Sequence, residues 1–307
     1  MFYHNARNGR NGLVYYIFTI LLTFLGYFIG QIPMFLVMFS RMNHYNDIGK
    51  DDLARFNENP DFTIFHIDRN LGMVLVLMTF VVAFAFLLLA VKYIHKRSIV
   101  SLFSTDGKID LRRFAWGFAL WFGLLIVAEL VFYAFAPDNY IFHRPGMSFF
   151  ILLIIAITLL PIQVTFEEVF TRGYIYQAVS YYTNNVFIGF LVSVIIFAAL
   201  HSFNPETIKY GLLPMMTYYI SAGILLGLVV IFDDRLELAI GIHYATNVFG
   251  ALILTYEGAA MQTDALFTAR SINPKLLAVE MIVLGLIFLF LAYRKYHWNI
   301  SKLKFNK

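Results

Sequence analysis

The sequence predicts an all-α, polytopic membrane protein of about eight transmembrane helices. Of its 307 residues, 60% are hydrophobic and only 14% are charged, and the mean hydropathy is +0.71. Soluble domains are nearer half apolar and about a quarter charged, so lipid is the solvent that suits this chain. Lipid offers no water to backbone polar groups, which restricts spanning segments to helices or a closed barrel. Long apolar runs favour helices, because barrel strands alternate polar and apolar residues.

Eight segments are candidate spans, since a helix needs roughly 20 residues to cross the hydrocarbon. The fifth (186–201) and seventh (236–256) of these segments are short or weakly polar, and hydropathy supports them least. No linker, low-complexity tract or internal repeat interrupts the chain, so we expect a single membrane domain over residues 1–307. The candidate spans are residues 13–40, 71–94, 114–136, 148–180, 186–201, 211–232, 236–256 and 277–293.

Lysine and arginine are unevenly distributed between the loops. With the N-terminus in the cytoplasm, the inside segments hold 15 of the 23 lysines and arginines and the outside segments hold 8. Positive charge concentrates on the cytoplasmic side, so we expect both termini to be cytoplasmic. Compact loops and the lack of retention signals favour a bacterial inner membrane. The polar stretch 41–70 is expected to be an extracytoplasmic connection with a short surface helix; a lid over a site is the alternative.

The composition also excludes several kinds of site. The chain has no cysteine, which rules out disulfides, thiolate metal sites and thiol catalysis. Its net charge of +4 comes from loop residues and shows no nucleic-acid-binding pattern. Membrane lipid is therefore an expected partner, and nucleic acid is not. Chemistry is best sought among ionisable residues inside the spans, because these are costly to bury and usually functional.

Two adjacent acids, Glu167 and Glu168, lie within the fourth candidate span. Glu168 and Arg172 are four residues apart, so they share a helix face and can form an ion pair that makes burial of both less costly. Glu167 lies about 100° around the helix and has no local partner, so desolvation suits it to the role of general base. The alternatives are a purely structural ion pair and a Glu167 side chain that reaches the cytoplasmic interface.

Two of the eight histidines lie within or at the edge of apolar runs near other polar residues. His201 ends the run 187–200, and Phe197 lies one helical turn earlier on the same face. His243 and Asn247 are spaced in the same way on the seventh candidate span. Taken alone, each has a structural interpretation, either as an interfacial histidine or as a pair of interhelical hydrogen-bonding groups.

Depth in the membrane bears on whether these residues can meet. At ~1.5 Å per helical residue, Glu167 and His201 lie roughly 20 Å and 22 Å from the cytoplasmic side. His243 lies only about 12 Å from Arg235 on the same scale. A tilted helix or an early re-entrant turn is needed to absorb this difference.

Taken in order, these residues resemble the three motifs of the CPBP family. These are the CaaX-protease and bacteriocin-processing intramembrane proteases, which include type II CaaX prenyl endopeptidases. The motifs here are Glu-Glu-x-x-x-Arg at 167–172, Phe-x-x-x-His at 197–201 and His-x-x-x-Asn at 243–247. Each motif alone is unspecific, but the ordered set is specific. The resemblance covers residues 110–256 and implies a CaaX-protease-like helical bundle with its catalytic core there.

The resemblance implies an intramembrane endopeptidase whose partner is a peptide or protein substrate that is membrane-associated, lipidated or CaaX-like. Glu167 would activate the attacking water with help from His201. Donors at His243 and Asn247 would stabilise the oxyanion of the tetrahedral intermediate. The expected catalytic set is Glu167, His201, His243 and Asn247, with Glu168, Arg172 and Phe197 in supporting positions.

Three alternatives stay open at this stage. We favour a metal-free glutamate mechanism and expect no cofactor, since the chain has no His-Glu-x-x-His motif. Glu167, His201 and His243 nevertheless offer one carboxylate and two imidazoles, which could bind zinc or another divalent metal. The chain could instead be a non-enzymatic membrane partner, such as a bacteriocin-immunity protein on the same fold. A proton-coupled transporter using the same three residues as a relay is less favoured.

Overall fold

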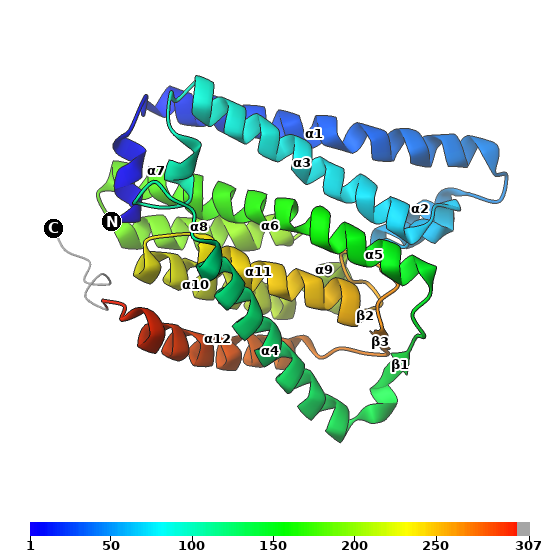
Figure 1. Ribbon diagram of the computed structural model, residues 1–307. Coiled ribbons are helices and arrows are strands. Elements are labelled where there is room, and N and C mark those ends of the chain that lie inside the picture. The colour runs from blue at the N-terminus through cyan, green and yellow to red at the C-terminus, as the bar shows by residue number, and fades with distance from the viewer. Residues whose placement is uncertain (300–307) are drawn as a thin grey trace.

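The computed structural model describes residues 1–299 and is an almost entirely helical bundle (Figure 1). Within these residues, six helices are long and apolar enough to cross a membrane, and two shorter apolar helices accompany them. The predicted all-α membrane fold is therefore confirmed, and the two shorter helices are the fifth and seventh candidate spans. The helices of the bundle are α1 (Leu13–His44), α3 (Arg69–Tyr93), α4 (Leu111–Phe135), α5 (Met147–Thr158), α6 (Leu160–Glu168), α7 (Gln177–Thr183), α8 (Val186–His201), α10 (Leu212–Asp233), α11 (Glu237–Val248) and α12 (Pro274–Tyr296).

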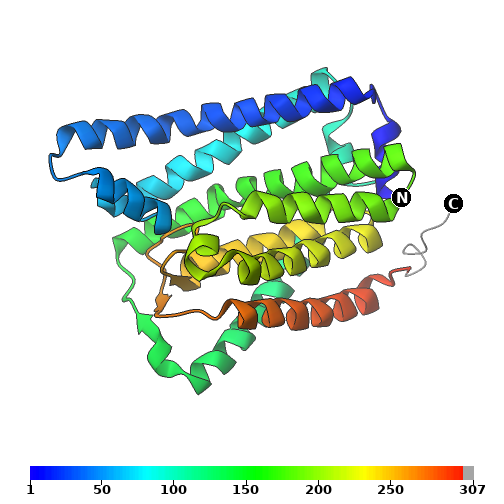
Figure 2. The same ribbon diagram turned by 180° about the vertical axis from the view of Figure 1, so that it is seen from behind.

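The helices pack around α11, which is buried over most of its length. It contacts α4, α6 and α10, while α1 pairs with α3 along one side and α12 packs on α10 (Figure 1, Figure 2). α5, α6 and α7 follow one another along a single path of 37 residues from Met147 to Thr183. α11 therefore lies where side chains from several helices can reach it.

A π-helical segment, Val169–Tyr176, separates α6 from α7 and is buried throughout. π-helical turns are rare and are frequent at functional sites. Gly173 is needed here, because a Cβ at this position would lie 2.6 Å from the carbonyl oxygen of Leu102. This close approach fixes the segment that carries Arg172.

The short helix α8 begins at a well-defined cap. Asn184 ends α7 in the left-handed conformation with a φ of 49°, and the side chain of Asn185 accepts hydrogen bonds from the N–H groups of Phe187 and Ile188. An asparagine at the N-cap satisfies N–H groups that have no partner within the helix. The cap sets the start of α8, and hence the place of His201 at its end.

Short elements close the end of the bundle opposite to the N-terminus (Figure 1). The segment 41–70 contains a short helix, as expected from the sequence. Three short strands form a sheet of order β1-β3-β2, in which β1 and β3 are antiparallel and β2 and β3 are parallel. These elements are α2 (Lys50–Glu58), α9 (Pro205–Tyr210), β1 (Tyr140–Phe142), β2 (Leu254–Tyr256) and β3 (Phe267–Ala269).

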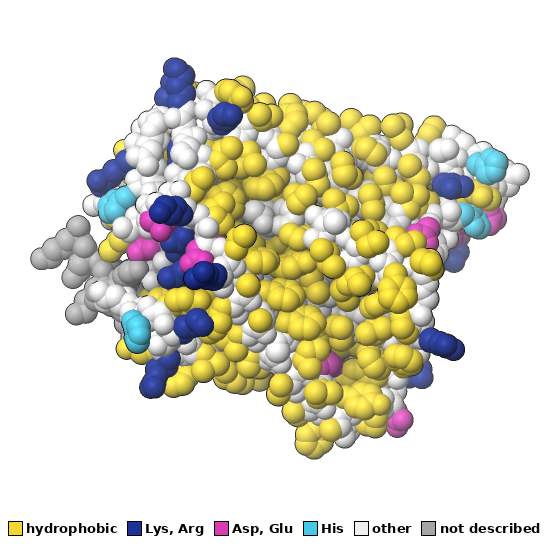
Figure 3. Space-filling model, viewed as in Figure 1, with side chains coloured by type: hydrophobic (Ala, Val, Ile, Leu, Met, Phe, Trp, Pro, Cys, Tyr) yellow, Lys and Arg dark blue, Asp and Glu magenta, His cyan; other side chains and the backbone are white. Residues whose placement is uncertain are grey.

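The surface of the bundle matches a membrane environment. Hydrophobic side chains cover its middle, and Lys and Arg gather most densely at the end where the N-terminus lies (Figure 3). Large side chains such as Leu21, Phe28 and Leu36 of α1 are more than half exposed, as befits a helix whose outer face contacts lipid. The chain is an integral membrane protein. Lys302, Lys304 and Lys307, which contribute to the predicted charge bias, lie outside the described residues.

Candidate active site

A cavity of about 820 Å³ lies within the bundle and is lined mainly by apolar side chains from α1, α3, α6, α8, α10, α11 and α12. All four residues expected to be catalytic line it, and Phe197 lines it as well. Glu168 and Arg172 are fully buried behind its wall. The structure therefore brings together the three motifs that lie far apart in the sequence.

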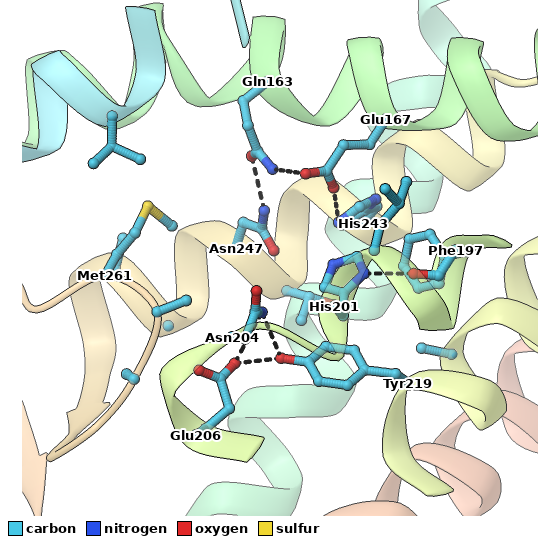
Figure 4. Close-up of a pocket in the computed structure, with 18 of the residues that line it drawn as sticks. Gln163, Glu167, Phe197, His201, Asn204, Glu206, Tyr219, His243, Asn247 and Met261 are labelled. Carbon is cyan, nitrogen blue, oxygen red and sulfur yellow. Dashed lines mark hydrogen bonds and ion pairs between the residues drawn. The ribbon is translucent and has the colours of Figure 1, made fainter. Parts of the chain in front are cut away.

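Glu167, on α6, and His243, on α11, both line the cavity, and their side chains point toward each other (Figure 4). Its Oε1 accepts a hydrogen bond of 2.7 Å from Nε2 of Gln163, and its Oε2 lies 3.4 Å from Nε2 of His243. The expectation that Glu167 has no local partner is wrong, since Gln163 lies one turn earlier on the same face. Oε2 itself accepts no hydrogen bond from the described residues.

Glu168 and Arg172 form the predicted ion pair, with 2.8 Å between Oε1 and Nη1. The same Oε1 lies 2.9 Å from Nδ1 of His243, so the pair also orients this histidine. The guanidinium of Arg172 stacks 4.3 Å above the ring of Phe197 and donates a 3.3 Å hydrogen bond to the carbonyl oxygen of Gly223. This arrangement links α6, α8, α10 and α11 behind the cavity.

His201 has a defined tautomer in its neutral form. Its Nδ1 lies 2.7 Å from the carbonyl oxygen of Phe197, and a carbonyl can only accept, so Nδ1 carries the hydrogen. Nε2 is then an acceptor. The ring lies between those of Phe197 and Tyr219, with centroids 4.4 Å and 4.5 Å away (Figure 4). His201 can therefore accept a hydrogen bond from a water molecule in the cavity.

Asn247 belongs to the same hydrogen-bond network as Glu167, and Gln163 links the two side chains. Its Nδ2 donates a 2.9 Å hydrogen bond to Oε1 of Gln163, whose Nε2 binds Glu167 (Figure 4). An amide nitrogen has two N–H donors, and this bond uses one of them. The estimated difference in depth between His243 and Glu167 does not separate them, as their side chains are in contact.

The cavity has a second polar cluster, which sequence analysis missed. Tyr219 of α10 and Asn204, which precedes α9, both donate hydrogen bonds to Oε1 of Glu206, and all three residues line the cavity. Asn204 follows His201 by three residues and lies just outside the Phe-x-x-x-His motif. Gln163 is uncharged, so it gives no signal of the kind that an ionisable residue gives inside an apolar span.

The structure bears on the alternative of a metal site. Within residues 1–299, no three side chains of His, Asp or Glu form a group that could hold a metal ion. The alternative ligands Glu167, His201 and His243 line one cavity without forming such a group, and the bond from Nδ1 of His243 to Glu168 leaves Nε2 of that ring available.

Comparison with known proteins identifies the family of the chain. The family model for type II CAAX prenyl endopeptidase Rce1-like proteins matches residues 146–249, which include all four catalytic candidates. The chain is 32% identical over 202 residues to the uncharacterized protein YyaK of Bacillus subtilis (strain 168), a match that covers 65% of this chain and 67% of YyaK. No solved structure gives a significant match. The chain thus belongs to the Rce1-like family of type II CAAX prenyl endopeptidases.

Proposed function

We propose that this protein is an intramembrane endopeptidase in which Glu167 activates a water molecule for attack on a peptide bond. The observation that carries the proposal is the meeting of three groups at one cavity. They are the unbonded Oε2 of Glu167, the acceptor nitrogen of His201 and the imidazole of His243. Oε2 of Glu168 is unbonded as well, but Glu168 is buried behind the wall, whereas Glu167 lines the cavity. Of the two acids, Glu167 is therefore the one that can meet a water molecule and a substrate as a general base.

In the proposed reaction, Glu167 takes a proton from water while Nε2 of His201 accepts the second hydrogen bond of that water. The hydroxide oxygen forms a bond to the scissile carbonyl carbon, and the carbonyl oxygen becomes an oxyanion. The carbon–nitrogen bond then breaks, and the proton held by Glu167 passes to the leaving amine. The apolar lining of the cavity favours these steps, because charge interactions strengthen where water is scarce.

His243 and Asn247 are the proposed oxyanion donors. Nδ1 of His243 donates to Glu168, so a second donor at Nε2 requires the imidazolium form. A positive His243 would sit between two carboxylates, with Arg172 behind Glu168, which balances the local charge. Asn247 can contribute the N–H that Gln163 does not use. Each such donor is typically worth about 3–4 kcal/mol of transition-state stabilisation.

The cavity fits a peptide that lies within or against the membrane. Its walls include residues outside the 110–256 core, such as Tyr27 of α1 and Phe80 of α3. We therefore propose that the whole chain acts as one membrane domain around that catalytic core. A location in the bacterial inner membrane with both termini in the cytoplasm belongs to the same proposal.

The test is cleavage of a membrane-anchored peptide library by the purified wild type, by Glu167→Gln and by Glu58→Gln, whose carboxylate is exposed. Loss of a general base lowers turnover by about 100-fold or more, so we expect activity in wild type and Glu58→Gln only. Equal cleavage by Glu167→Gln would remove Glu167 from the mechanism. Activity should survive a strong chelator; loss that zinc or cobalt alone restores would favour the metal alternative.

A further inference from the structure

The cavity is acidic as well as apolar. Four carboxylates line it, those of Glu129, Glu167, Glu206 and Glu280, and its lining includes no lysine or arginine from the described part of the chain. Apart from His243, whose imidazolium form is proposed above, the described lining offers these acids no cation. Like charges in a poorly hydrated space repel strongly, so the part of the lining away from His243 favours a cationic group over an anionic one.

Glu206 is the carboxylate whose burial most needs a ligand to explain it. It is only 3% exposed. Its Oε1 accepts hydrogen bonds from Asn204 and Tyr219, both uncharged, whereas Oε2 has no hydrogen-bond partner in the described structure. Lys209, on the same short helix, pairs instead with Glu257 at 2.7 Å. A buried carboxylate without a cation is costly, and the missing partner points to a ligand.

Burial raises the pKa of Glu206, and the hydrogen bonds from Tyr219 and Asn204 offset this rise only in part. None of these groups carries a positive charge. A bound cation would favour the ionised form, because an opposite charge at short range stabilises a carboxylate. The cluster is therefore electrostatically incomplete as it stands.

The cluster adjoins the catalytic residues. The ring of Tyr219 packs on His201 with 4.5 Å between centroids, and the backbone N–H of Asn204 donates a 3.1 Å hydrogen bond to the carbonyl oxygen of His201. Figure 4 shows Glu206, Asn204 and Tyr219 beside His201 and below Asn247. An extended peptide advances ~3.4 Å per residue, so a residue close to the scissile bond can reach this cluster.

We propose that Asn204, Glu206 and Tyr219 form an acidic subsite that binds a cationic group of the peptide substrate close to the scissile bond. The cation is an ammonium or guanidinium, supplied by a lysine or arginine side chain or by a free N-terminal amine. An ammonium has three donors, which suit Oε2 of Glu206 and the side-chain oxygen of Asn204. This inference rests on the proposed peptidase function and names its substrate class: apolar, membrane-associated peptides with a positive charge near the cleaved bond.

The test uses four apolar peptides of one parent sequence. Three are N-acetylated and carry Lys, norleucine or Glu at positions scanned around the cleaved bond; the fourth carries norleucine and a free N-terminus. With wild type, we expect kcat/KM for the best Lys peptide or for the free-amine peptide to exceed that of the acetylated norleucine peptide about tenfold or more, as for a desolvated charge pair. Which of the two is favoured identifies the source of the cation.

Glu206→Gln should bring the ratio of kcat/KM between the cationic peptides and the acetylated norleucine peptide close to one, because the ratio reports the charge contact and cancels any general effect on turnover. Glu58→Gln is the matched control and should keep the preference. Equal cleavage of the Lys, free-amine and norleucine peptides by wild type would overturn the proposal. So would a Glu206→Gln protein that slows all peptides equally. Should Glu206→Gln not fold, the wild-type peptide profile and Glu206→Asp, which keeps the charge, still decide the matter.

A binding measurement can test the subsite separately from the proposed peptidase function. Fluorescence anisotropy of labelled peptides with Glu167→Gln measures binding without any cleavage. Tighter binding of the cationic peptides, lost in the Glu167→Gln/Glu206→Gln double variant, supports the subsite even if no peptide is cleaved. A protein that cleaves peptides but binds all four with the same affinity has no such subsite.

Discussion

At the scale of single residues, Gln163 connects the proposed base, Glu167, with a proposed oxyanion donor, Asn247. Through one amide it donates to Glu167 and accepts from Asn247, at 2.7 Å and 2.9 Å. A single side chain thereby sets the orientation of both the proposed base and a proposed oxyanion donor. We regard Gln163 as a positioning residue, because it acts through its neighbours and needs no contact with the reacting atoms.

Gln163→Leu should lower kcat about 10-fold to 100-fold with little change in KM, because it removes the anchors of two groups that act in the transition state. The matched control is Gln31→Leu, which alters another glutamine of the cavity wall on α1. Steady-state kinetics on the peptide identified with wild type would measure both. A Gln163→Leu protein with normal kcat and raised KM would show that the residue serves binding alone.

The residues of the site were largely predictable, because charge inside an apolar span is conspicuous. Glu168 and Arg172 pair as their spacing predicts, and the histidines of two other segments reach the same cavity. Gln163 and Asn204 were not predictable in this way. Neutral polar side chains cost less to bury, so their presence in a span or at its end indicates little until the partner they bind is known.

At the scale of elements, the close backbone contact between α4 and α11 determines where α11 presents its side chains to the cavity. A Cβ on Gly241 of α11 would lie 2.5 Å from the carbonyl oxygen of Phe114, and one on Gly117 of α4 would lie 2.9 Å from that of Leu238. Two small residues therefore let the helices approach closely, as in other membrane bundles. Gly241 precedes His243 by two residues, so the contact also places that histidine.

Gly241→Ala should reduce both stability and turnover. The added methyl group meets backbone atoms that cannot move aside, and such overpacking typically costs about 1–3 kcal/mol. Gly123→Ala on α4 is the control, since a Cβ there has no neighbour within 4 Å. Thermal unfolding in detergent and turnover of the same peptide measure both effects. An unchanged unfolding temperature and full activity in Gly241→Ala would mean that the close contact does not position His243.

Element boundaries were predicted unevenly. Hydropathy located the long spans well, because a run of about twenty apolar residues has the length of a helix that crosses the hydrocarbon. It could not indicate the π-helical segment Val169–Tyr176, whose residues would equally suit an α-helix. It also missed the short strands Leu254–Tyr256 and Phe267–Ala269, which are defined by pairing across the chain rather than by local pattern.

The cavity is a property of the whole molecule. Its walls include Tyr27 of α1, Phe80 of α3 and Glu280 of α12, all outside the segment that carries the motifs. Phe56, Pro60 and Phe62, from the polar segment 41–70, line it as well. The sequence predicted the helices one by one but not this enclosure, because tertiary packing determines which faces meet. The end of the bundle that holds α2 therefore borders the site.

The orientation of the molecule then determines from which side a soluble part of the substrate would approach. Lys and Arg gather at the opposite end (Figure 3), and from the positive-inside rule we propose that this end lies in the cytoplasm. On this argument the end that includes α2 faces outward. The substrate would be a peptide at the outer face of the membrane, such as an exported one.

A chain without cysteine allows this orientation to be tested cleanly. Ala54 of α2 and Thr105, in the loop before α4, are both exposed and lie outside the proposed site. In intact cells, a membrane-impermeant maleimide should label Ala54→Cys and leave Thr105→Cys unmodified, because only the outer end is accessible. Permeabilised cells should show labelling of both, which controls for reactivity. The reverse pattern would place the basic end outside, and the substrate would then have to approach α2 from the cytoplasm.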